Sequence, residues 1–435
     1  MPLFATSSPV IGFRIRVLGL SVLGGGVTGG SPRPQKILKN LILIMTNILI
    51  LLPTLCFAAI LLFLRKGLYR LDSSDQASTA AVNQNQNLKF SVIIAARNEE
   101  RNIAACLQSV FAQDISAKLY EVIVIDDRSE DATPAILREY AASHQNLRAL
   151  TVAETPAGVS PKKHAVSMGI KEAANDIIVF TDADCTVPPQ WLSTIGAHFD
   201  NDTALVQGIT SYKYIDGMNK LFYGLQSVDF LSHGVVAAAA IGAQLPINAN
   251  ANNMAFRKKA FEEVGGYGED TGVTLGDDDH LLQRVWRHNR TAGGGAYKIR
   301  YMAAARGAVE TAPTETPAAL FRQRSRWGSV TVHYGARQVA LLSAVFIFYL
   351  TIPATALMAL FDATYLPVFA SLLFVKFCGE LVLMIPGTRI FGKKHLRKYI
   401  PLASLLQLPV VLAAVFSGVF GKFDWKGRKT GRKIG

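Results

Sequence analysis

Long apolar runs near both ends of the chain contrast with an alternating pattern between them. Four of these runs reach the roughly 20 residues that a helix needs to cross the hydrocarbon core of a bilayer. They are residues 41–64, 339–360, 365–386 and 399–420. One such run is compatible with a buried core helix, whereas four in one chain favour membrane spans.

Between the first and second runs, short stretches rich in β-branched residues alternate with stretches at helical spacing. Strands are predicted at 90–96, 120–125, 147–153 and 176–180, and helices after the first three of them, over roughly 97–113, 131–144 and 162–174. Continuous apolar strands that alternate with amphipathic helices predict an α/β domain with a mainly parallel sheet covered on both faces. The polar residues 72–88 predict a linker ahead of this domain.

The composition fits a membrane protein that carries a globular domain. Half of the 435 residues are hydrophobic and 18% are charged, below the about 25% of an ordinary soluble domain. The net charge of +13 raises the question of a nucleic-acid partner, but the basic residues gather beside the apolar runs, at 65–70, 389–398 and 422–433. Such placement is typical of cytoplasmic loops and indicates anionic lipid headgroups as the partner. No nucleic-acid motif is present.

The sequence leaves part of the membrane arrangement open. The glycine-rich residues 1–40 predict a disordered extension. Four widely spaced cysteines, without the spacing of a zinc site or a disulfide framework, fit a reducing, cytosolic setting for the globular part. Three full spans after a cytosolic domain would place the basic tail outside. The last run contains Pro401, Gln407 and Pro409, so it is compatible with a span or with a re-entrant or interfacial segment.

Acidic and amide side chains follow the predicted strands. Asn98 and Glu99 come after the first, Asp126 and Asp127 after the second, and a TDADC stretch at 181–185 after the fourth. Ligands of parallel α/β sheets bind beyond the carboxyl ends of the strands, so these residues mark a candidate site. The turns contain no GxGxxG and no GxxxxGK[ST], which argues against a dinucleotide fold and a P-loop.

Two aspartates in the TDADC stretch suit a metal. Asp182 and Asp184 are two residues apart, and in an extended segment such residues point the same way. Their hard oxygens suit Mg²⁺ or Mn²⁺ on a diphosphate. The alternative is a loop with two solvated aspartates.

Three further motifs each permit a purely structural interpretation and a functional one. In DDRSED (126–131), Ser129 or Asp131 can cap the next helix, while Asp127 can bind a nucleobase or a ribose. Lysines at PKKH (161–164) open a helix, where an anion such as phosphate would favour them over two solvated side chains. QRSRW (323–327) suits a helix lying on the membrane surface, or can bring a cation to a leaving diphosphate.

A triple aspartate, Asp277-Asp278-Asp279, precedes an apolar pair. If a helix begins here, at about 100° per residue, the following apolar residues centre near the direction of Asp278. Asp278 alone then points into the buried face, where a carboxylate needs a function because desolvation is costly. Asp277 and Asp279 are expected to act as supporting charge at the helix start.

Taken in order, these motifs resemble those of the membrane-bound family 2 glycosyltransferases, which include cellulose, chitin and hyaluronan synthases and ceramide glucosyltransferases. The resemblance covers roughly residues 88–330 together with the spans. It implies the nucleotide-sugar-binding GT-A fold over 89–330, about three membrane segments over 339–420 and a basic tail at 421–435. Residues 252–267 resemble the acceptor-side segment of the family.

The resemblance also implies a role for each motif. The residues expected to bind the nucleotide-sugar donor are Asn98, Glu99, Asp126, Asp127, Lys162 and Asp182. Asp182 and Asp184 are expected to hold Mg²⁺ or Mn²⁺. The residues expected to be catalytic are Asp278, Gln323, Arg326 and Trp327, with Asp278 as the base.

The activity that follows is an inverting transfer of a sugar from a nucleotide-sugar donor to a lipid or polysaccharide acceptor. Because nucleotide sugars are cytosolic, the domain is expected to face the cytoplasm, in a multi-pass protein of the inner membrane. The alternatives are a processive polysaccharide synthase and, in another class, a catalytically silent membrane subunit that binds nucleotide sugars.

Overall fold

The computed structural model describes residues 34–80, 88–268, 276–291, 297–329, 334–420, 423–425 and 428–430. Two compact units meet between Leu49 and Ile50. The first helix, α1 (Pro34–Ala80), belongs to both. Residues 34–40 are therefore helical rather than disordered, and residues 72–80 continue the helix where a linker was expected. Residues 1–33 and 81–87 lie outside the described part.

The first half of the globular domain follows the predicted alternation. Its elements are β1 (Phe90–Ala96), α2 (Ile103–Phe111), β2 (Tyr120–Asp126), α3 (Thr133–Ser143), β3 (Leu147–Thr151), α4 (Pro161–Glu172) and β4 (Ile177–Phe180). Strands β1 to β4 are all parallel. Strand β3 ends two residues before the predicted 153.

The second half extends the sheet and adds helices. Its elements are β5 (Cys185–Thr186), α5 (Trp191–Ala197), β6 (Thr203–Gly208), β7 (Thr210–Tyr212), α6 (Lys220–Gly242), β8 (Met254–Arg257), α7 (Lys258–Glu263), α8 (Asp277–Thr291), β9 (Lys298–Met302), β10 (Val309–Thr311) and α9 (Pro317–Gly328). The main sheet has the order β3-β2-β1-β4-β8-β6-β9, in which β8 is antiparallel to both neighbours. A small sheet has the order β5-β10-β7.

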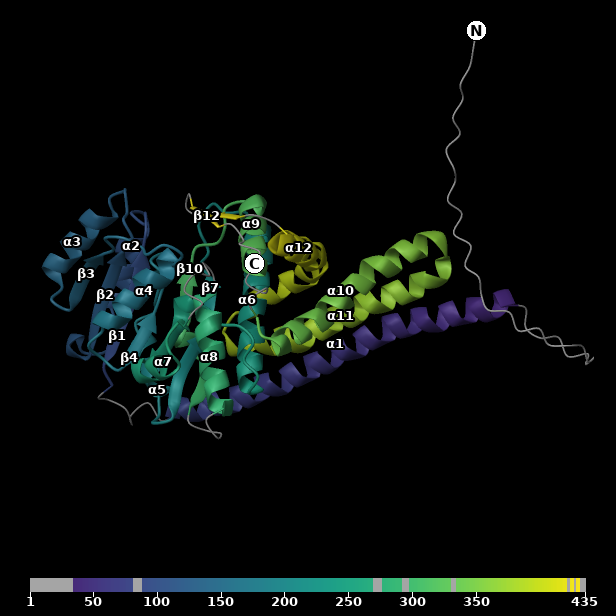
Figure 1. Ribbon diagram of the computed structural model, residues 1–435, viewed down its shortest axis with the longest axis horizontal. Coiled ribbons are helices and arrows are strands. Elements are labelled where there is room, and N and C mark those ends of the chain that lie inside the picture. The colour runs from purple at the N-terminus through teal and green to yellow at the C-terminus, as the bar shows by residue number, and fades with distance from the viewer. Residues whose placement is uncertain are drawn as a thin grey trace, which may run out of the picture. The chain divides into compact units, whose positions relative to one another are not determined.

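Successive side chains of the central strands point to opposite faces of the sheet, and each face contributes to its own part of the core. The strands and helices of this domain are labelled in Figure 1. Val92 and Ile94 pack with α2, α3 and α5 on one face, whereas Ile93 packs with α4 and α8 on the other. All three are almost inaccessible, as the two-residue period of a strand requires when both faces are covered. The mainly parallel α/β fold predicted from the sequence is confirmed.

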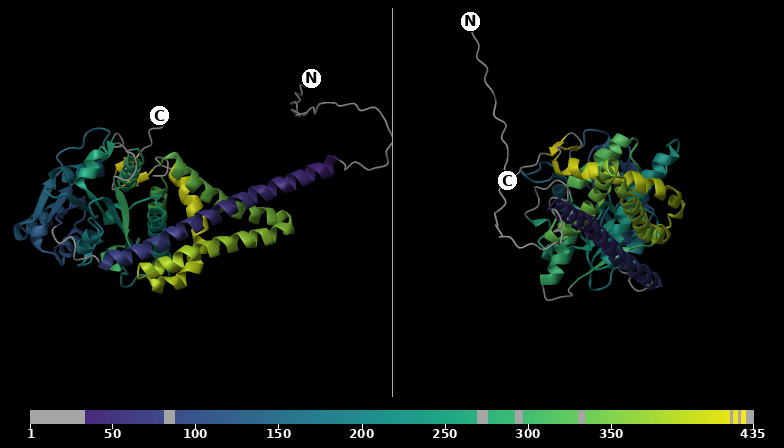
Figure 2. Two further views of the ribbon diagram at one scale, coloured as in Figure 1. Left: turned by 90° about the horizontal axis from the view of Figure 1, so that it is seen from below. Right: turned by 90° about the vertical axis from the view of Figure 1, so that its right-hand side faces the viewer.

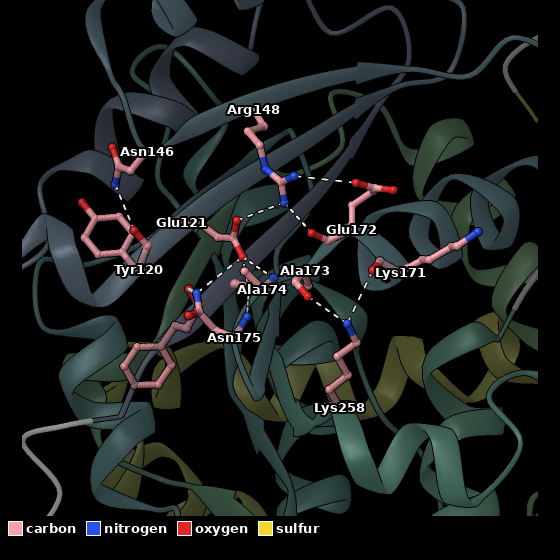
Figure 3. Close-up of polar contacts among 12 residues, drawn as sticks. Tyr120, Glu121, Asn146, Arg148, Lys171, Glu172, Ala173, Ala174, Asn175 and Lys258 are labelled. Carbon is pink, nitrogen blue, oxygen red and sulfur yellow. Dashed lines mark hydrogen bonds and ion pairs between the residues drawn. The ribbon is translucent and has the colours of Figure 1, made fainter.

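The amino-terminal edge of the sheet is closed by a polar network around Glu121 (Figure 3). Its carboxylate accepts hydrogen bonds from the Ser91 hydroxyl at 2.6 Å and from the Ala174 amide at 2.7 Å. The guanidinium of Arg148 lies 3.1 Å from its other oxygen. These bonds satisfy Glu121 within the protein, so this edge is a structural closure, and the opposite carboxyl edge is left for ligands.

Five helices among the described residues are long and apolar enough to cross a membrane. They are residues 44–71 of α1, the whole of α6, α10 (Ala336–Phe361), residues 363–390, which include α11 (Leu366–Ile390), and residues 394–417, which include most of α12 (Ile400–Phe420). They include the four predicted segments. Helices α10 and α11 lie side by side (Figures 1 and 2). The described parts of the basic tail form the hairpin of β11 (Phe423–Trp425) and β12 (Arg428–Thr430).

Helix α6 is the additional candidate. Its mean hydropathy is 1.2, against 2.0 or more for the other four, and two thirds of its apolar window are buried in the protein. It crosses α1 where glycine meets glycine: a Cβ on Gly67 would lie 2.0 Å from the Ala239 carbonyl oxygen, and one on Gly242 would lie 2.2 Å from the Gly67 oxygen. Only glycines allow the two backbones to approach so closely.

Candidate active site

The loops after β1 and β2 are braced against each other. The Asn98 amide donates to the Ser129 hydroxyl, and the Asn98 side-chain oxygen accepts from the Glu130 amide, both at 2.9 Å. The Asn98 side-chain oxygen is therefore already used within the fold. Asp131 does not occupy the cap position of α3, which is Ala132, but its carboxylate accepts from the Thr133 amide at 3.0 Å where α3 begins.

Asp126 and Asp127 are both buried, with 4% and 5% of their surfaces exposed. One oxygen of Asp126 accepts from the Ser129 amide at 3.1 Å. One oxygen of Asp127 accepts from Arg128 at 3.1 Å, and the Asp127 carbonyl accepts from Arg97 at 2.8 Å. Two arginines thus surround the acid that the sequence assigns to the nucleobase, and they compensate for the burial of its charge.

The two aspartates after β4 form the centre of an acidic cluster. Lys162, at the start of α4, lies with its Nζ 3.2 Å from Oδ1 of Asp182. The Asp184 side chain reaches solvent, yet protein surrounds most of it. This desolvation, and then the negative charges of Asp182 and Glu99, raise the pKa of Asp184 to about 6, against the opposing charge of Lys162. Lys162 is not a solvated surface lysine, because Asp182 is its partner.

This cluster suits a divalent cation on a diphosphate. The pKa of Asp184 is raised by desolvation first and then by the charges of Asp182 and Glu99, so added positive charge is favourable here. Among the described residues, no group of three or more His, Cys, Asp or Glu could hold a metal alone. The hard oxygens of Asp182 and Asp184 fit Mg²⁺ or Mn²⁺, whose remaining ligands usually come from substrate phosphates and water.

Two thiols that the sequence analysis did not select lie behind the acids. Cys106 of α2 donates a weak 3.6 Å hydrogen bond to the Asp182 carbonyl, and the Cys185 thiol lies 3.6 Å from Oδ1 of Asp184. Burial first, and then the charges of Asp184 and Asp182, raise the pKa of both thiols. They are neutral packing groups rather than nucleophiles.

The other lysine at the start of α4 differs from Lys162. Lys163 is 1% exposed and lies 3.4 Å from Nδ1 of His280 and 5.8 Å from the centre of the Tyr267 ring. It joins α4 to α8 beneath the site. The interpretation as two solvated lysines is therefore wrong for this pair.

Helix α9 brings a cation toward the acids. Burial lowers the pKa of the half-buried Arg326, while the charges of Asp182 and Asp184, the next-largest influences on it, act in the opposite direction. Arg326 therefore lies within electrostatic reach of both aspartates, although it is about 140 residues away in sequence. The Gln323 side-chain oxygen accepts from the Tyr212 hydroxyl at 3.0 Å, which ties α9 to the small sheet.

Arg324 belongs to the QRSRW stretch but is not among the residues that the sequence analysis expected to be catalytic. It is 5% exposed, and its Nε donates to the Asp229 carboxylate of α6 at 2.5 Å. Its guanidinium carbon lies 4.1 Å from the centre of the Trp327 ring. Trp327 also packs against Phe230, with ring centres 5.7 Å apart. Arg324 and Trp327 therefore anchor α9 on α6.

The triple aspartate does begin a helix, but the burial of its individual side chains differs from the prediction. Oδ2 of the half-buried Asp278 accepts from the Ala251 amide at 2.9 Å. Asp279, expected to be supporting charge, is the more buried, at 7% exposure. Its oxygens accept from the Ala249 amide and the Tyr334 hydroxyl, both at 2.6 Å. The Asp277 side chain lies outside the described part.

The error has a physical cause. The helical wheel located the face of α8 that covers the sheet, where Leu281 and Val285 are indeed buried. In the first turn, however, side chains lean back toward the amino terminus of the helix. There they meet residues 249–251 and Tyr334, so the neighbouring segment decides which aspartate is enclosed.

The segment that resembles the acceptor side is partly structural. Asn253 is fully buried, and its amide group donates to the carbonyls of Ile209 at 2.7 Å and Gly307 at 2.9 Å. Its oxygen accepts from the Trp191 indole at 2.9 Å. Asn253 thus holds β6, α5 and the β9–β10 connection together and does not reach an acceptor.

The globular domain is similar to known glycosyltransferases. The family model "Glycosyl transferase family 2" matches residues 91–265. Glycosyltransferase AglE of Haloferax volcanii is 34% identical over 204 residues, which are 45% of this chain and 60% of that protein. The beta-monoglucosyldiacylglycerol synthase of Synechocystis is 27% identical over 246 residues, 54% of this chain and 46% of that protein. The chain thus spans about half of the length of these relatives.

Among solved structures, the mannosyltransferase PcManGT from Pyrobaculum calidifontis in complex with GDP-Man and Mn²⁺ aligns with a TM-score of 0.49 and 17% identity, over 84% of this chain and 99% of that one. Residues 1–349 of TarS from S. aureus align with a TM-score of 0.39 and 14% identity, over 79% of this chain and 96% of that one.

Proposed function

We propose that the chain, whose residues 91–265 match the model of glycosyl transferase family 2, is a membrane-bound, metal-dependent, inverting glycosyltransferase. It transfers a sugar from a nucleotide-sugar donor to a lipid. The observation that carries this proposal is the meeting of opposite charges at the carboxyl edge of the sheet. Lys162, the aspartates 182 and 184, and Arg326 come from distant parts of the chain and influence one another electrostatically.

This arrangement matches what a nucleoside diphosphate leaving group requires. The buried Asp127 and its arginine neighbours lie at the end of β2, beside the acids that follow β4 across β1. A nucleoside held at β2 therefore places its diphosphate toward Asp182 and Asp184. Asp182 and Asp184 would hold a divalent cation, which would supply Lewis-acid chemistry to the leaving diphosphate. Lys162 and Arg326 add positive charge as the diphosphate leaves.

Asp278 is the residue proposed to take the acceptor proton. The acceptor oxygen attacks the anomeric carbon on the face opposite the diphosphate, the bond from that carbon to the diphosphate breaks with its electron pair, and the hydroxyl proton passes to Asp278. Each of its oxygens receives one amide hydrogen bond at 2.9 Å, from Ala251 and from Asp279. These donors favour the ionised form and orient it.

The surroundings of the domain support a lipid acceptor and a cytoplasmic site. Helices that are long and apolar enough to cross a membrane favour a position of the active domain at a bilayer surface, where an acceptor lipid is available. One similar protein is named as a beta-monoglucosyldiacylglycerol synthase, whose product is a glycolipid. Nucleotide sugars are cytosolic, and the basic residues beside the spans favour the cytoplasmic side for the domain.

The full chain in nanodiscs of bacterial polar lipids tests the proposal. It is incubated with UDP-, GDP- and dTDP-linked sugars, with and without Mn²⁺, and released nucleoside diphosphate and lipid products are measured by mass spectrometry. We expect one donor to release its diphosphate only with metal and to yield a singly glycosylated lipid. Asp184→Asn should abolish the release, and the exposed Asp216→Asn should not.

Two outcomes would replace the proposal. Products of many sugar units would identify a processive synthase. Binding of a nucleotide sugar without release of its diphosphate, by a folded chain supplied with metal and lipids, would identify a catalytically silent binding subunit.

A further inference from the structure

A cavity of about 450 Å³ lies beside α8, where α10 begins. It is separate from the acidic cluster. Three segments line it: residues 245–247, the face of α8 that carries Gln283 and Trp286, and residues 335–341. Most of the exposed lining is apolar, and Leu245, Ile247 and Leu341 contribute to it. A cavity of this kind suits a hydrocarbon chain better than a sugar or a nucleotide.

The position of the cavity places it at a membrane surface. Helix α10 has a mean hydropathy of 2.1 and is long enough to cross a bilayer. Its first residues form one wall of the cavity, so the cavity lies at the end of the span, level with the lipid headgroups if α10 crosses. Trp286, a side chain typical of that level, forms part of the lining. A lipid in the adjoining leaflet can therefore reach the cavity.

The charged side chains at the cavity have one sign. Arg287 and Arg337 both line it and both are exposed, and no acidic residue belongs to its described lining. The Arg287 guanidinium lies against the start of α10, 3.0 Å from the point that a Cβ on Gly335 would occupy. Two arginines from different helices beside an apolar wall complement a group with a hydrocarbon part and a phosphate, because guanidinium binds phosphate in a bidentate manner.

We propose that this cavity binds one anionic phospholipid of the bilayer as a specific ligand. An acyl chain lies against Leu245, Ile247 and Leu341, and the phosphate lies between Arg287 and Arg337. The binding itself does not depend on sugar transfer, and neither arginine has a role in the proposed chemistry.

The same segment that lines the cavity also holds the proposed base. The Pro246 carbonyl accepts from Gln283 of α8 at 2.9 Å, and the Ile247 carbonyl accepts from Gln338 of α10 at 2.8 Å. Four residues later, the Ala251 amide binds Asp278. A lipid between α8 and α10 would therefore steady residues 245–251. If the chain is the proposed transferase, anionic lipid should raise its turnover, a consequence that rests on the proposed function.

Lipid retention by the full chain tests the proposal directly. The chain is reconstituted in nanodiscs of phosphatidylcholine and phosphatidylglycerol in equal amounts, released into mild detergent, and examined by native mass spectrometry. We expect one phosphatidylglycerol to remain bound per chain in preference to phosphatidylcholine. In Arg287→Gln/Arg337→Gln the preference should fall about thirtyfold, because each arginine contributes about one kcal/mol to binding an anionic headgroup.

Two further variants make the result specific. Lys66→Gln/Lys394→Gln removes two exposed cations beside other spans and should retain phosphatidylglycerol like the unaltered chain. Leu341→Trp keeps both arginines but fills the cavity, so this variant should lose the bound lipid. It also provides the test if the double arginine variant does not fold. Equal retention of both lipids by the unaltered chain would overturn the proposal, as would full retention in a folded Leu341→Trp or double arginine variant. None of these outcomes depends on whether sugar is transferred.

Discussion

The backbone amide of Ala251 donates a 2.9 Å hydrogen bond to Oδ2 of Asp278. This contact joins the first turn of α8 to the segment that leads into β8. It fixes the orientation of the half-buried carboxylate without neutralising its charge. A group held in this way has the properties of a general base that is ready before the acceptor arrives.

Replacing Asp278 by asparagine should therefore remove transfer and leave donor binding intact. The asparagine oxygen can still accept from Ala251 and only the hydrogen bond from the Asp279 amide is lost, so we expect the fold to be preserved, but the amide cannot take a proton. We expect turnover to fall by about 10²–10⁴-fold, with nucleotide-sugar affinity, measured by calorimetry, unchanged. Asp216→Asn removes the same charge at an exposed position and should behave like the unaltered chain. If Asp278→Asn instead abolished donor binding, the assignment as base would be wrong.

Two arginines two residues apart on α9 should have opposite kinds of effect. Arg326→Gln removes the cation that faces Asp182 and Asp184, so turnover should fall while the melting temperature stays the same. Arg324→Gln leaves the Asp229 carboxylate without its partner and should lower the free energy of unfolding by about 3 kcal/mol. Thermal unfolding and diphosphate release, measured on both variants, separate the roles. Equal loss of stability in the two would contradict this division.

Metal affinity should depend on pH through Asp184. Its carboxyl has a pKa raised to about 6, so it is protonated below that pH and ionised above it. A divalent cation binds the ionised form, and its affinity should therefore fall by up to about tenfold per pH unit as the pH decreases below 6. Calorimetric titration of the full chain with Mn²⁺ between pH 5 and pH 8 measures this.

The control for the pH dependence is Asp184→Asn. In that variant the residual Mn²⁺ affinity should be weak and should lack the step near pH 6. A step of unchanged size in the variant would show that another group is responsible.

The parts of the site that the sequence predicts are those set by local patterns. The positions of β1, β2 and β4 follow from apolar runs that both faces of a sheet must bury, and the rule that ligands bind at carboxyl edges then selects Asp127, Asp182 and Asp184. The structure brings the last two together with Lys162. No long-range information was needed for this step, because each acid lies within four residues of the end of its own strand.

The parts that the sequence does not predict depend on partners far along the chain. Asp279 is enclosed by Tyr334, 55 residues later, and Arg324 is buried against Asp229, 95 residues earlier. Helical phase describes one face of one element, whereas these contacts arise where separate elements meet. Helix α6 was not predicted as a candidate span for a related reason. Its moderate hydropathy reflects burial inside the protein rather than contact with lipid.

A polar cluster within the apolar helices should prove essential to stability. Lys376 of α11 is 2% exposed, pairs with Glu380, and donates to the Ser404 carbonyl of α12 at 2.6 Å. The Tyr349 hydroxyl of α10 donates to Glu380 at 2.9 Å. Glu380→Leu leaves a buried ammonium without its carboxylate, which should cost about 3–5 kcal/mol of the free energy of unfolding. Thermal unfolding in detergent, followed by size-exclusion chromatography, measures the loss.

The double variant Lys376→Met/Glu380→Leu decides whether the cluster acts through charge pairing. With both charges replaced by apolar groups of similar size, most of the lost stability should return, because no charge remains to be buried. Glu139→Leu, on the exposed side of α3, is the control and should leave the melting temperature nearly unchanged. Helix α12 also contacts α9, where the Ser325 and Ser417 hydroxyls lie 2.6 Å apart. Glu380→Leu should therefore lose activity along with stability, and Lys376→Met/Glu380→Leu should recover both. A stable but inactive double variant would show that the pair serves the reaction itself.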